Sequence, residues 1–524
     1  MSFEEDRGIT LLVKDYFRFL PWLAPVIATV LPLKSMVNID NIFYHVIIKP
    51  MSKSTLQNIP VSAGEIIDLQ IDSMAYDNSA LARYKDFVIF VDRGAPGDSV
   101  QAQITTLRPN YARAKIIEIK KSDSNYRTEA PCKLFKVCGG CQWQHLPYEK
   151  QLEQKDLLLK NFFSKLNLEE SVLKSIIGAN NSFVIARSIS DEAISQKQYR
   201  SGEIASPASG GLAMTGGEWH YRNKVQYPVR TIEDTGRLKA GYFEWHSNDL
   251  INIKYCPIQN NLFDSIVETV RELAPKYKII AYSSKNKTGW LRHICVRIGE
   301  NTNEALLTLV AVNESLSRSQ EFANEVMSRH TELVGVCINI NTNTTNVIYG
   351  SKTKVLKGRG YIFEKINNLK FKISATSFFQ VNTLQTTKLL DVIDNMIHGD
   401  APLGLLYNII LDAYCGVGLM SLFLSKHAKQ IVGIEEVKQS IDDAIFSAKE
   451  NKIQNTVFIN AKVENRIKDI LEKYKPEVVI LDPPRAGCNK KILENVLSSN
   501  VKKIIYTSCN PSTLTRDLEI LRNN

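Results

Sequence analysis

The pattern of apolar and polar residues divides the chain into three regions of different type. Between residues 61 and 120 the apolar positions alternate in short runs such as "EIIDLQI", "FVIFV" and "SVQAQI", and a Pro96-Gly97 turn separates two of them. Such runs predict a small antiparallel β-barrel. A helical pattern, "KQLEQKDLLLKNFFSKL", follows. Strand-like runs then return between "YRNKVQYPV" and "FKISATSFFQVN", including "HICVRIG", "ALLTLVAV" and "VGVCININ", and predict a second β-rich region.

After about residue 400, strands and helices alternate along the chain. This alternation predicts an α/β domain with a doubly wound parallel sheet, in which ligands bind at the carboxyl ends of the strands. Four of the predicted strands lead into Tyr414, Glu435, Asp482 and Cys509. We therefore expect these four residues to converge at one edge of the sheet.

A glycine-rich turn follows the first strand of this domain. Gly416 and Gly418 allow a sharp turn and let a ligand approach the next helix closely. Glu435 lies seventeen residues after Gly418, where a carboxylate could accept hydrogen bonds from two ribose hydroxyls. The pattern favours an S-adenosylmethionine site. The alternative is another nucleotide-binding α/β domain, in which these acidic residues would be part of the core.

Cys509 stands in "KKIIYTSCNPSTLTRDL", between an apolar run and the start of a helix. Asn510 can cap that helix and Pro511 can occupy its first position. The partial positive charge at a helix N-terminus favours the thiolate form of cysteine. Cys509 is therefore a candidate nucleophile, and the alternative is a small buried apolar side chain.

A second group of cysteines lies in "PCKLFKVCGGCQWQH", with a C-x5-C-x2-C spacing of Cys132, Cys138 and Cys141. "KYCPI" could supply a fourth thiolate, Cys256. Three soft ligands so close together predict a metal site. The spacing is compatible with zinc or iron–sulfur, and a tight trio with one distant cysteine favours iron–sulfur.

Composition and charge narrow the class of protein. The chain has 524 residues, of which 44% are hydrophobic and 23% charged, as is ordinary for a soluble protein of two to four domains. Its net charge of +10 favours a polyanionic partner. From Arg108 to Lys136, eight basic residues face three acidic ones, with Tyr111, Tyr126 and Phe135 among them. This mixture of basic and aromatic residues is suited to phosphate contacts and base stacking in RNA. A solvent-exposed surface without a ligand would have the same composition.

Nine cysteines are too few for a disulfide framework, and without a convincing cleavable signal the pattern indicates a cytoplasmic protein. The apolar stretch at residues 19–33, "FLPWLAPVIATVLPL", is short for a membrane span and is broken by three prolines, so we expect no membrane anchor. Residues 185–217 are rich in Ser, Ala and Gly and predict a disordered insertion.

Together these motifs resemble the RNA 5-methyluridine (uracil-5-) methyltransferases. In particular, the chain is similar to the 23S rRNA branch, which carries a TRAM barrel and a 4Fe-4S cluster. The motifs "CGGC", "FFQVN", "DAYCGVG", "LDPPRAG" and "SCNPSTLTRDL" occur in the family's order. The resemblance covers roughly residues 52 to 524.

The resemblance implies S-adenosyl-L-methionine and a 4Fe-4S cluster as cofactors and RNA, most specifically 23S rRNA, as the substrate. It implies Cys509 as the nucleophile that attacks the uracil ring. The implied cluster ligands are Cys132, Cys138, Cys141 and Cys256. The expected contacts to the methyl donor, counting the two glycines of the turn, are Gln380, Tyr414, Gly416, Gly418, Glu435 and Asp482.

The expected domains follow the same division of the chain. They are an accessory extension (1–51), a TRAM or OB-like RNA-binding barrel (52–122), an iron–sulfur and β-rich central region (123–372) and a Rossmann-like methyltransferase domain (373–524). We expect a monomer without a membrane partner.

The chain departs from the family pattern in three places. Leu419 follows Gly418 where the family typically has a polar side chain, and Lys462 replaces another polar contact. The barrel lacks the usual Gly-x-Gly near Met74. The sequence stops at Asn524, before the segment with the family's proton-abstracting glutamate and last strands. These departures predict an impaired enzyme and an exposed sheet edge.

Three other functions compete with this one. A tRNA uridine-5 methyltransferase would show the same catalytic motifs, and a degenerate RNA-binding iron–sulfur protein would keep the same scaffold. A cytosine-5 RNA methyltransferase would carry Pro-Cys in the loop that here reads Asp482-Pro483-Pro484-Arg485, so it ranks lower.

Overall fold

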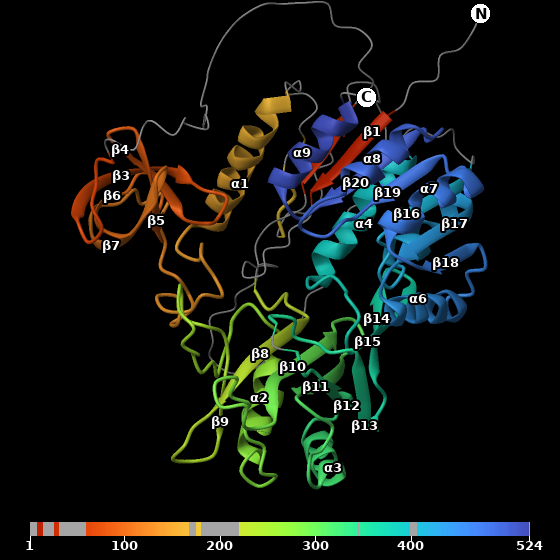
Figure 1. The fold of residues 1–524 in the computed structure, drawn as a ribbon, viewed down its shortest axis with the longest axis horizontal. Coiled ribbons are helices and arrows are strands. Elements are labelled where there is room, and N and C mark those ends of the chain that lie inside the picture. Colours follow the sequence, from red (N-terminus) through yellow and green to blue (C-terminus); the bar gives the residue numbers. More distant parts are fainter. Residues whose placement is uncertain are drawn as a thin grey trace, which may run out of the picture.

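The computed structural model describes residues 8–13, 26–30, 59–166, 174, 176–179, 219–343, 345–398 and 406–522. They form a small barrel, a central sheet with two helices, and a C-terminal α/β domain (Figure 1). The insertion that the sequence predicts at 185–217 lies outside the described residues.

The predicted barrel is present and closed, with the strand order β3-β4-β5-β7-β6. Its strands are β3 (Ile66–Met74), β4 (Ala80–Tyr84), β5 (Phe87–Asp92), β6 (Ser99–Leu107) and β7 (Tyr111–Lys121). Alternate side chains, such as Ile89 and Val91, fill its interior. The prediction of a wholly antiparallel barrel is wrong at one seam, because the long strand β7 runs parallel to β5 and closes the barrel there.

The predicted helix after the barrel is α1 (Tyr148–Phe163). It stands between the barrel and the C-terminal domain (Figure 1). Its Gln154 side chain accepts a hydrogen bond from the backbone N–H of Met74, at 3.1 Å. Leu159 and Phe163 belong to the same hydrophobic cluster as Leu514 of the last helix, so α1 fixes the barrel to the C-terminal domain.

The central region is a six-stranded sheet of order β13-β12-β11-β10-β8-β9. Its strands are β8 (Lys224–Thr231), β9 (Leu238–Ala240), β10 (Leu291–Gly299), β11 (Glu304–Ala311), β12 (Leu333–Ile340) and β13 (Lys352–Gly358). The three strand-like runs that the sequence predicted here are β10, β11 and β12. Helices α2 (Asn261–Leu273) and α3 (Ser319–Arg329) pack on one face. A hairpin of β14 (Tyr361–Ile366) and β15 (Leu369–Ser374) leads into the last domain.

The C-terminal domain has the predicted parallel sheet, with the order β18-β17-β16-β19-β20. Its strands are β16 (Tyr407–Ala413), β17 (Ala428–Glu435), β18 (Thr456–Asn460), β19 (Val478–Leu481) and β20 (Lys503–Ser508). Its helices are α4 (Thr383–His398), α5 (Leu419–Phe423), α6 (Lys438–Glu450), α7 (Val463–Tyr474), α8 (Lys490–Leu497) and α9 (Pro511–Arg522). The strand order reverses between β16 and β19, which is where ligands bind in sheets of this type.

The outer edge of β20 is paired, so the prediction of an exposed sheet edge is wrong. Strand β1 (Gly8–Val13) runs parallel to β20, and β2 (Val26–Val30) pairs antiparallel with β1 (Figure 1). The N-terminal segment thus satisfies the backbone groups that an edge strand would leave open. Strand β2 lies within the apolar stretch at 19–33. In the described part of the chain, no helix is long and apolar enough to cross a membrane.

Candidate active site and cysteine pocket

The strand register brings together the four residues that the sequence predicted to converge. Ala413 lies opposite both Ile434 of β17 and Leu481 of β19. Tyr414, Glu435 and Asp482 each follow one of these aligned positions directly, so they lie side by side at the carboxyl edge. Leu481 also lies opposite Tyr506 of β20, and the same edge therefore includes the turn that carries Cys509.

The turn after β16 is shaped by positive backbone φ angles. Tyr414 has φ 68°, Gly416 55° and Gly418 78°. A Cβ atom at Gly418 would lie 3.1 Å from both Ala444 and the ring of Phe458. Glycine is therefore required at 418 by close packing as well as by conformation, whereas no atom lies within 4 Å of a Cβ added at Gly416.

Glu435 is held between two loops by backbone donors. One carboxylate oxygen accepts a hydrogen bond from the N–H of Gly416 at 3.2 Å, and the other accepts one from the N–H of Val437 at 2.8 Å. Burial raises the pKa of Glu435, and the two backbone donors act against this shift. The carboxylate is thus fixed beside the glycine turn, with its remaining lone pairs as acceptors for a ligand.

Two departures from the family pattern lie close to this edge. Leu419 begins helix α5 and is 7% exposed, as part of the apolar core. Lys462 precedes α7 with an exposed side chain whose ammonium nitrogen lies 3.9 Å from Glu436. Neither side chain therefore places a polar group among the residues that line the carboxyl edge of the sheet.

Cys509 occupies the predicted turn between β20 and α9. The side-chain oxygen of Asn510 accepts hydrogen bonds from the N–H groups of Ser512 (3.0 Å) and Thr513 (3.4 Å), and so caps α9. All nine cysteines are described, and seven of them are buried, whereas Cys509 and Cys132 are partly exposed. A partly exposed thiol at a helix N-terminus is the setting that favours a thiolate.

The loop of the "LDPPRAG" motif is attached to α9 by a carboxylate that the sequence analysis did not assign. Asp517 is fully buried, and its Oδ2 accepts hydrogen bonds from Tyr506 (2.5 Å) and from the N–H of Cys488 (2.7 Å). In the sequence, Asp517 falls on the apolar face of α9, between Leu514 and Leu521, and this position could have predicted its burial.

Gln380 lies on a separate segment, at the junction with the central sheet. Its carbonyl oxygen accepts a hydrogen bond from the side chain of Asn223, at 2.8 Å. The segment is anchored by the fully buried Asp443 of α6, which accepts hydrogen bonds from the hydroxyls of Ser374 (2.7 Å) and Ser377 (2.6 Å). This anchor holds the "FFQVN" motif against the C-terminal domain.

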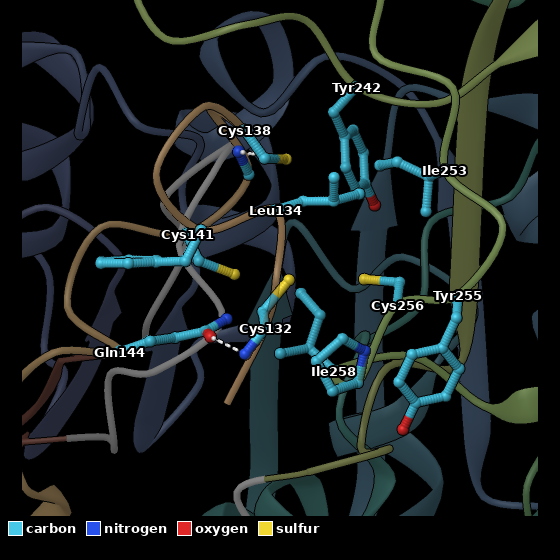
Figure 2. A pocket seen from close by; sticks show the side chains of 13 residues that line it. Cys132, Leu134, Cys138, Cys141, Gln144, Tyr242, Ile253, Tyr255, Cys256 and Ile258 are labelled. Atoms are coloured by element: carbon cyan, nitrogen blue, oxygen red, sulfur yellow. Dashed lines mark hydrogen bonds between the residues drawn. The ribbon is translucent and has the colours of Figure 1, made fainter. Parts of the chain in front are cut away.

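The four cysteines that the sequence grouped for a metal line one small pocket (Figure 2). Cys132, Cys138 and Cys141 come from the loop before α1, and Cys256 comes from the segment before α2. Their sulfur atoms point into the space between these two segments, which Leu134, Tyr242 and Ile253 also line (Figure 2).

The pocket has properties that suit a thiolate-bound group. Its lining beside the thiols is largely apolar, and the N–H of Gly140 donates to the sulfur of Cys138 at 3.3 Å. A Cβ at Gly140 would lie 3.1 Å from the ring of Tyr242, so a side chain there would have to displace that ring. Burial raises the pKa of all four thiols, that of Cys256 to about 12. In the described residues, no three potential ligands meet as they would around one metal ion.

Part of the basic run at 108–136 is structural. Arg127 forms an ion pair with the buried Asp98 at 2.5 Å, and Phe135 is buried. Arg93, which the sequence analysis did not single out, stacks over Phe135 at 4.8 Å and donates a hydrogen bond to the carbonyl of Cys138 at 3.3 Å. The barrel thereby contacts the cysteine loop.

Two family models match parts of this chain. The sequence model described as tRNA (Uracil-5-)-methyltransferase matches residues 304–524, and the TRAM domain matches residues 60–117. An uncharacterized RNA methyltransferase of Bacillus cereus is 32% identical over 470 residues, covering 89% of this chain and 93% of the relative. One of Listeria monocytogenes is 34% identical over 458 residues, covering 87% and 91%.

The fold also matches a solved structure. The chain is similar to the crystal structure of Pyrococcus abyssi tRNA (uracil-54, C5)-methyltransferase in complex with S-adenosyl-L-homocysteine, with a TM-score of 0.63 and 20% identity. The match covers 87% of this chain and 93% of that chain. The C-terminal domain therefore has the fold of S-adenosylmethionine-dependent methyltransferases. The chain belongs to the RNA uracil-5-methyltransferase family and carries a TRAM domain.

Proposed function

We propose that this protein transfers a methyl group from S-adenosyl-L-methionine to C5 of a uridine in RNA, with Cys509 as the nucleophile. The observation that carries the proposal is the alignment of Tyr414, Glu435 and Asp482 with the Cys509 turn at one edge of the sheet. The proposed cofactor site and the candidate thiolate would thus be adjacent. The family relationship supports the same reaction.

The methyl donor fits the turn after β16. Glu435 would accept hydrogen bonds from the ribose hydroxyls, and the glycine turn would allow close approach of the donor. Tyr414 and Asp482 flank the point where the strand order reverses, and Gln380 would contact the donor from the central-sheet side. The sulfonium supplies the methyl group for transfer.

Cys509 overcomes the low reactivity of uracil C5. Its thiolate adds to C6, and the electrons of the C5–C6 double bond move to the O4 oxygen as an enolate. C5 of this enolate then takes the methyl group, and S-adenosylhomocysteine leaves. A base removes the remaining C5 proton, the double bond re-forms, and the C6–S bond breaks to return the thiolate.

The outer face of the barrel fits single-stranded RNA. Phe90 lies opposite Arg113 across β5 and β7, and the rings of Phe90 and Tyr111 are 5.4 Å apart. The guanidinium of Arg113 lies 5.5 Å from the centre of the Phe90 ring. Aromatic rings for base stacking beside a cation for phosphates are the elements that such RNA sites use. A flipped-out uridine could then reach the Cys509 edge.

We further propose that Cys132, Cys138, Cys141 and Cys256 hold a 4Fe-4S cluster. The support is that the four sulfur atoms point into one largely apolar pocket. Four thiolates are the ligand set of such clusters, and an N–H donor to a ligand sulfur, as at Gly140, suits them as well. The cluster would fix the cysteine loop to the segment before α2.

The substrate we propose is 23S rRNA, modified by a monomer of this protein. The experiment is liquid chromatography with mass spectrometry of rRNA and tRNA from a deletion strain. Loss of one 5-methyluridine from 23S rRNA, restored by the intact gene and not by Cys509→Ala, would support the proposal. Loss from tRNA would assign the activity to tRNA instead. No loss from either would favour a non-catalytic RNA-binding protein.

A further inference from the structure

A tyrosine of the barrel reaches the residue next to the candidate nucleophile. Tyr76 lies in the connection between β3 and β4. Its hydroxyl donates a hydrogen bond to the side-chain oxygen of Asn510, at 2.7 Å. Its ring packs edge-on against Phe162 of α1, with 5.4 Å between ring centres. Asn510 directly follows Cys509, so the barrel contacts the catalytic turn although 434 positions separate the two residues.

Asn510 is the residue that fixes this turn. The oxygen that accepts from Tyr76 also caps α9, and the side-chain amide donates to the carbonyl of Arg485 at 3.1 Å. The backbone N–H of Asn510 donates to the hydroxyl of Ser508 at 3.1 Å. Asn510 therefore joins α9, the "LDPPRAG" loop and the barrel at the position that sets the backbone of Cys509.

The connection that carries Tyr76 is itself tied to the outer face of the barrel. Asp77 pairs with Arg113, and its other oxygen accepts from the N–H of Ser79 at 3.1 Å. Arg113 also donates to the hydroxyl of Ser79 at 3.2 Å. A continuous set of contacts thus runs from the aromatic and basic face of the barrel, through the 76–79 connection, to the turn that bears Cys509.

We propose that Tyr76 is a positioning residue for Cys509. It acts through Asn510. Because Tyr76 belongs to the barrel, the position of the Cys509 thiol then depends on how the RNA-binding barrel packs against α1. The inference rests on the proposed function for its role in the reaction. A barrel seated on α1 completes the hydrogen bonds of Asn510 and holds the thiol in place. A displaced barrel removes one of these bonds and loosens the turn.

The test uses the full-length protein with Tyr76→Phe, which keeps the ring on Phe162 and removes only the donor. We expect the single-turnover rate of methyl transfer at saturating RNA and cofactor to fall about three- to tenfold, as for loss of one neutral hydrogen bond. The affinities for RNA and S-adenosylmethionine should stay within about twofold of wild type, because both sites keep their own contacts.

Tyr277→Phe is the control. Tyr277 donates its phenol hydroxyl to Glu325 of α3 at 2.6 Å, so this variant also loses a tyrosine hydroxyl bond but leaves the barrel and the catalytic turn untouched. It should keep the wild-type single-turnover rate. Weaker RNA binding as the sole effect of Tyr76→Phe would overturn the proposal, because Tyr76 would then belong to the RNA site.

A double-mutant cycle tests whether Tyr76 acts through Asn510. Asn510→Ser keeps a capping hydroxyl for α9 and shortens the side chain that meets Tyr76. In this background Tyr76→Phe should have no further effect on the single-turnover rate. Fully additive effects would show that Tyr76 acts by another route and would overturn the proposal.

Labelling of Cys509 by iodoacetamide, followed by peptide mass spectrometry, gives a measurement without RNA or cofactor. A loosened turn exposes the partly buried thiol, so Tyr76→Phe should speed labelling of Cys509 by about threefold or more, and Tyr277→Phe should not. If the wild-type protein methylates no RNA, the proposed function is wrong. Faster labelling of Cys509 in Tyr76→Phe would still support the contact between Tyr76 and the turn. Unchanged labelling together with an unchanged single-turnover rate would overturn it.

Discussion

The hydroxyl of Tyr506 donates a hydrogen bond of 2.5 Å to Asp517, inside the C-terminal domain. Tyr506 belongs to β20 and Asp517 to α9, so the bond spans the turn that carries Cys509. The same carboxylate oxygen accepts the N–H of Cys488 at 2.7 Å. Asp517 thus ties together the strand before the turn, the helix after it and the neighbouring loop.

Asp517→Ala should therefore destabilise the C-terminal domain. The change leaves the hydroxyl of Tyr506 and the N–H of Cys488 buried without this acceptor, which costs about 1 to 3 kcal/mol of unfolding free energy for each group. Urea unfolding followed by tryptophan fluorescence and circular dichroism measures the loss. Glu519→Ala, an exposed position on the same helix, is the control and should change stability by less than about 0.5 kcal/mol. Equal stability of the two variants would contradict the assignment.

Glu435→Ala should weaken binding of S-adenosylmethionine by about 1 to 3 kcal/mol, because in the proposed site two ribose hydroxyls would lose their half-buried acceptor. Isothermal titration calorimetry measures the affinity directly. Glu436→Ala is the matched control, since Glu436 is the exposed neighbour of the same charge. An affinity unchanged in Glu435→Ala would place the ribose elsewhere.

Protein purified without oxygen should be brown and contain about four irons per chain. Cys138→Ser should lower the iron content and the solubility more than the rate of methyl transfer per folded molecule, because the cysteine pocket fixes structure. Cys295→Ser, at a buried thiol outside the pocket, should keep its iron. Metal analysis and visible absorbance decide the question. Stoichiometric zinc in a colourless protein would rule out the cluster.

The local sequence pattern was sufficient to predict most helices and strands. It also predicted that the candidate site residues converge at one edge of the sheet. Alternating apolar positions predicted the barrel strands, and the alternation of strands and helices predicted the parallel sheet. Because carboxyl ends of parallel strands share one edge, Tyr414, Glu435, Asp482 and Cys509 could be placed together without a structure. The four cysteines of the pocket were likewise grouped by spacing and residue type.

Pairings between distant segments could not be predicted in this way. The run Gly8–Val13 is short, and nothing local specifies its pairing with β20. The bond between Tyr76 and Asn510 depends on how the barrel sits on α1. The basic run at 108–136 looked uniform, but Arg127 pairs with a buried carboxylate while Arg113 stays on the barrel face. Side-chain partners of this kind follow from tertiary packing.

The fate of a covalent adduct gives the sharpest test of the proposed mechanism. In that mechanism, attack of Cys509 on C6 and methyl transfer need no further base, whereas release of the cysteine requires removal of the C5 proton. Among the described residues after Cys509, the carboxylates are Asp517 and Glu519. Asp517 is fully buried and bonded to Tyr506 and Cys488, and Glu519 lies on the exposed side of α9. Helix α9 therefore does not supply the base, and in the proposed mechanism the proton would go to another part of the protein or to water.

We therefore predict that a protein–RNA adduct forms before the methylated RNA is released. Incubation with unmodified rRNA and labelled S-adenosylmethionine, sampled at early times, should give a denaturation-resistant band that carries the label, and Cys509→Ala should give none. The band should rise first and fall as free 5-methyluridine appears. Methylated RNA made by Cys509→Ala would show that the reaction does not pass through this cysteine. Neither adduct nor product, in protein that binds S-adenosylmethionine by calorimetry, would favour an RNA-binding protein that has lost the reaction.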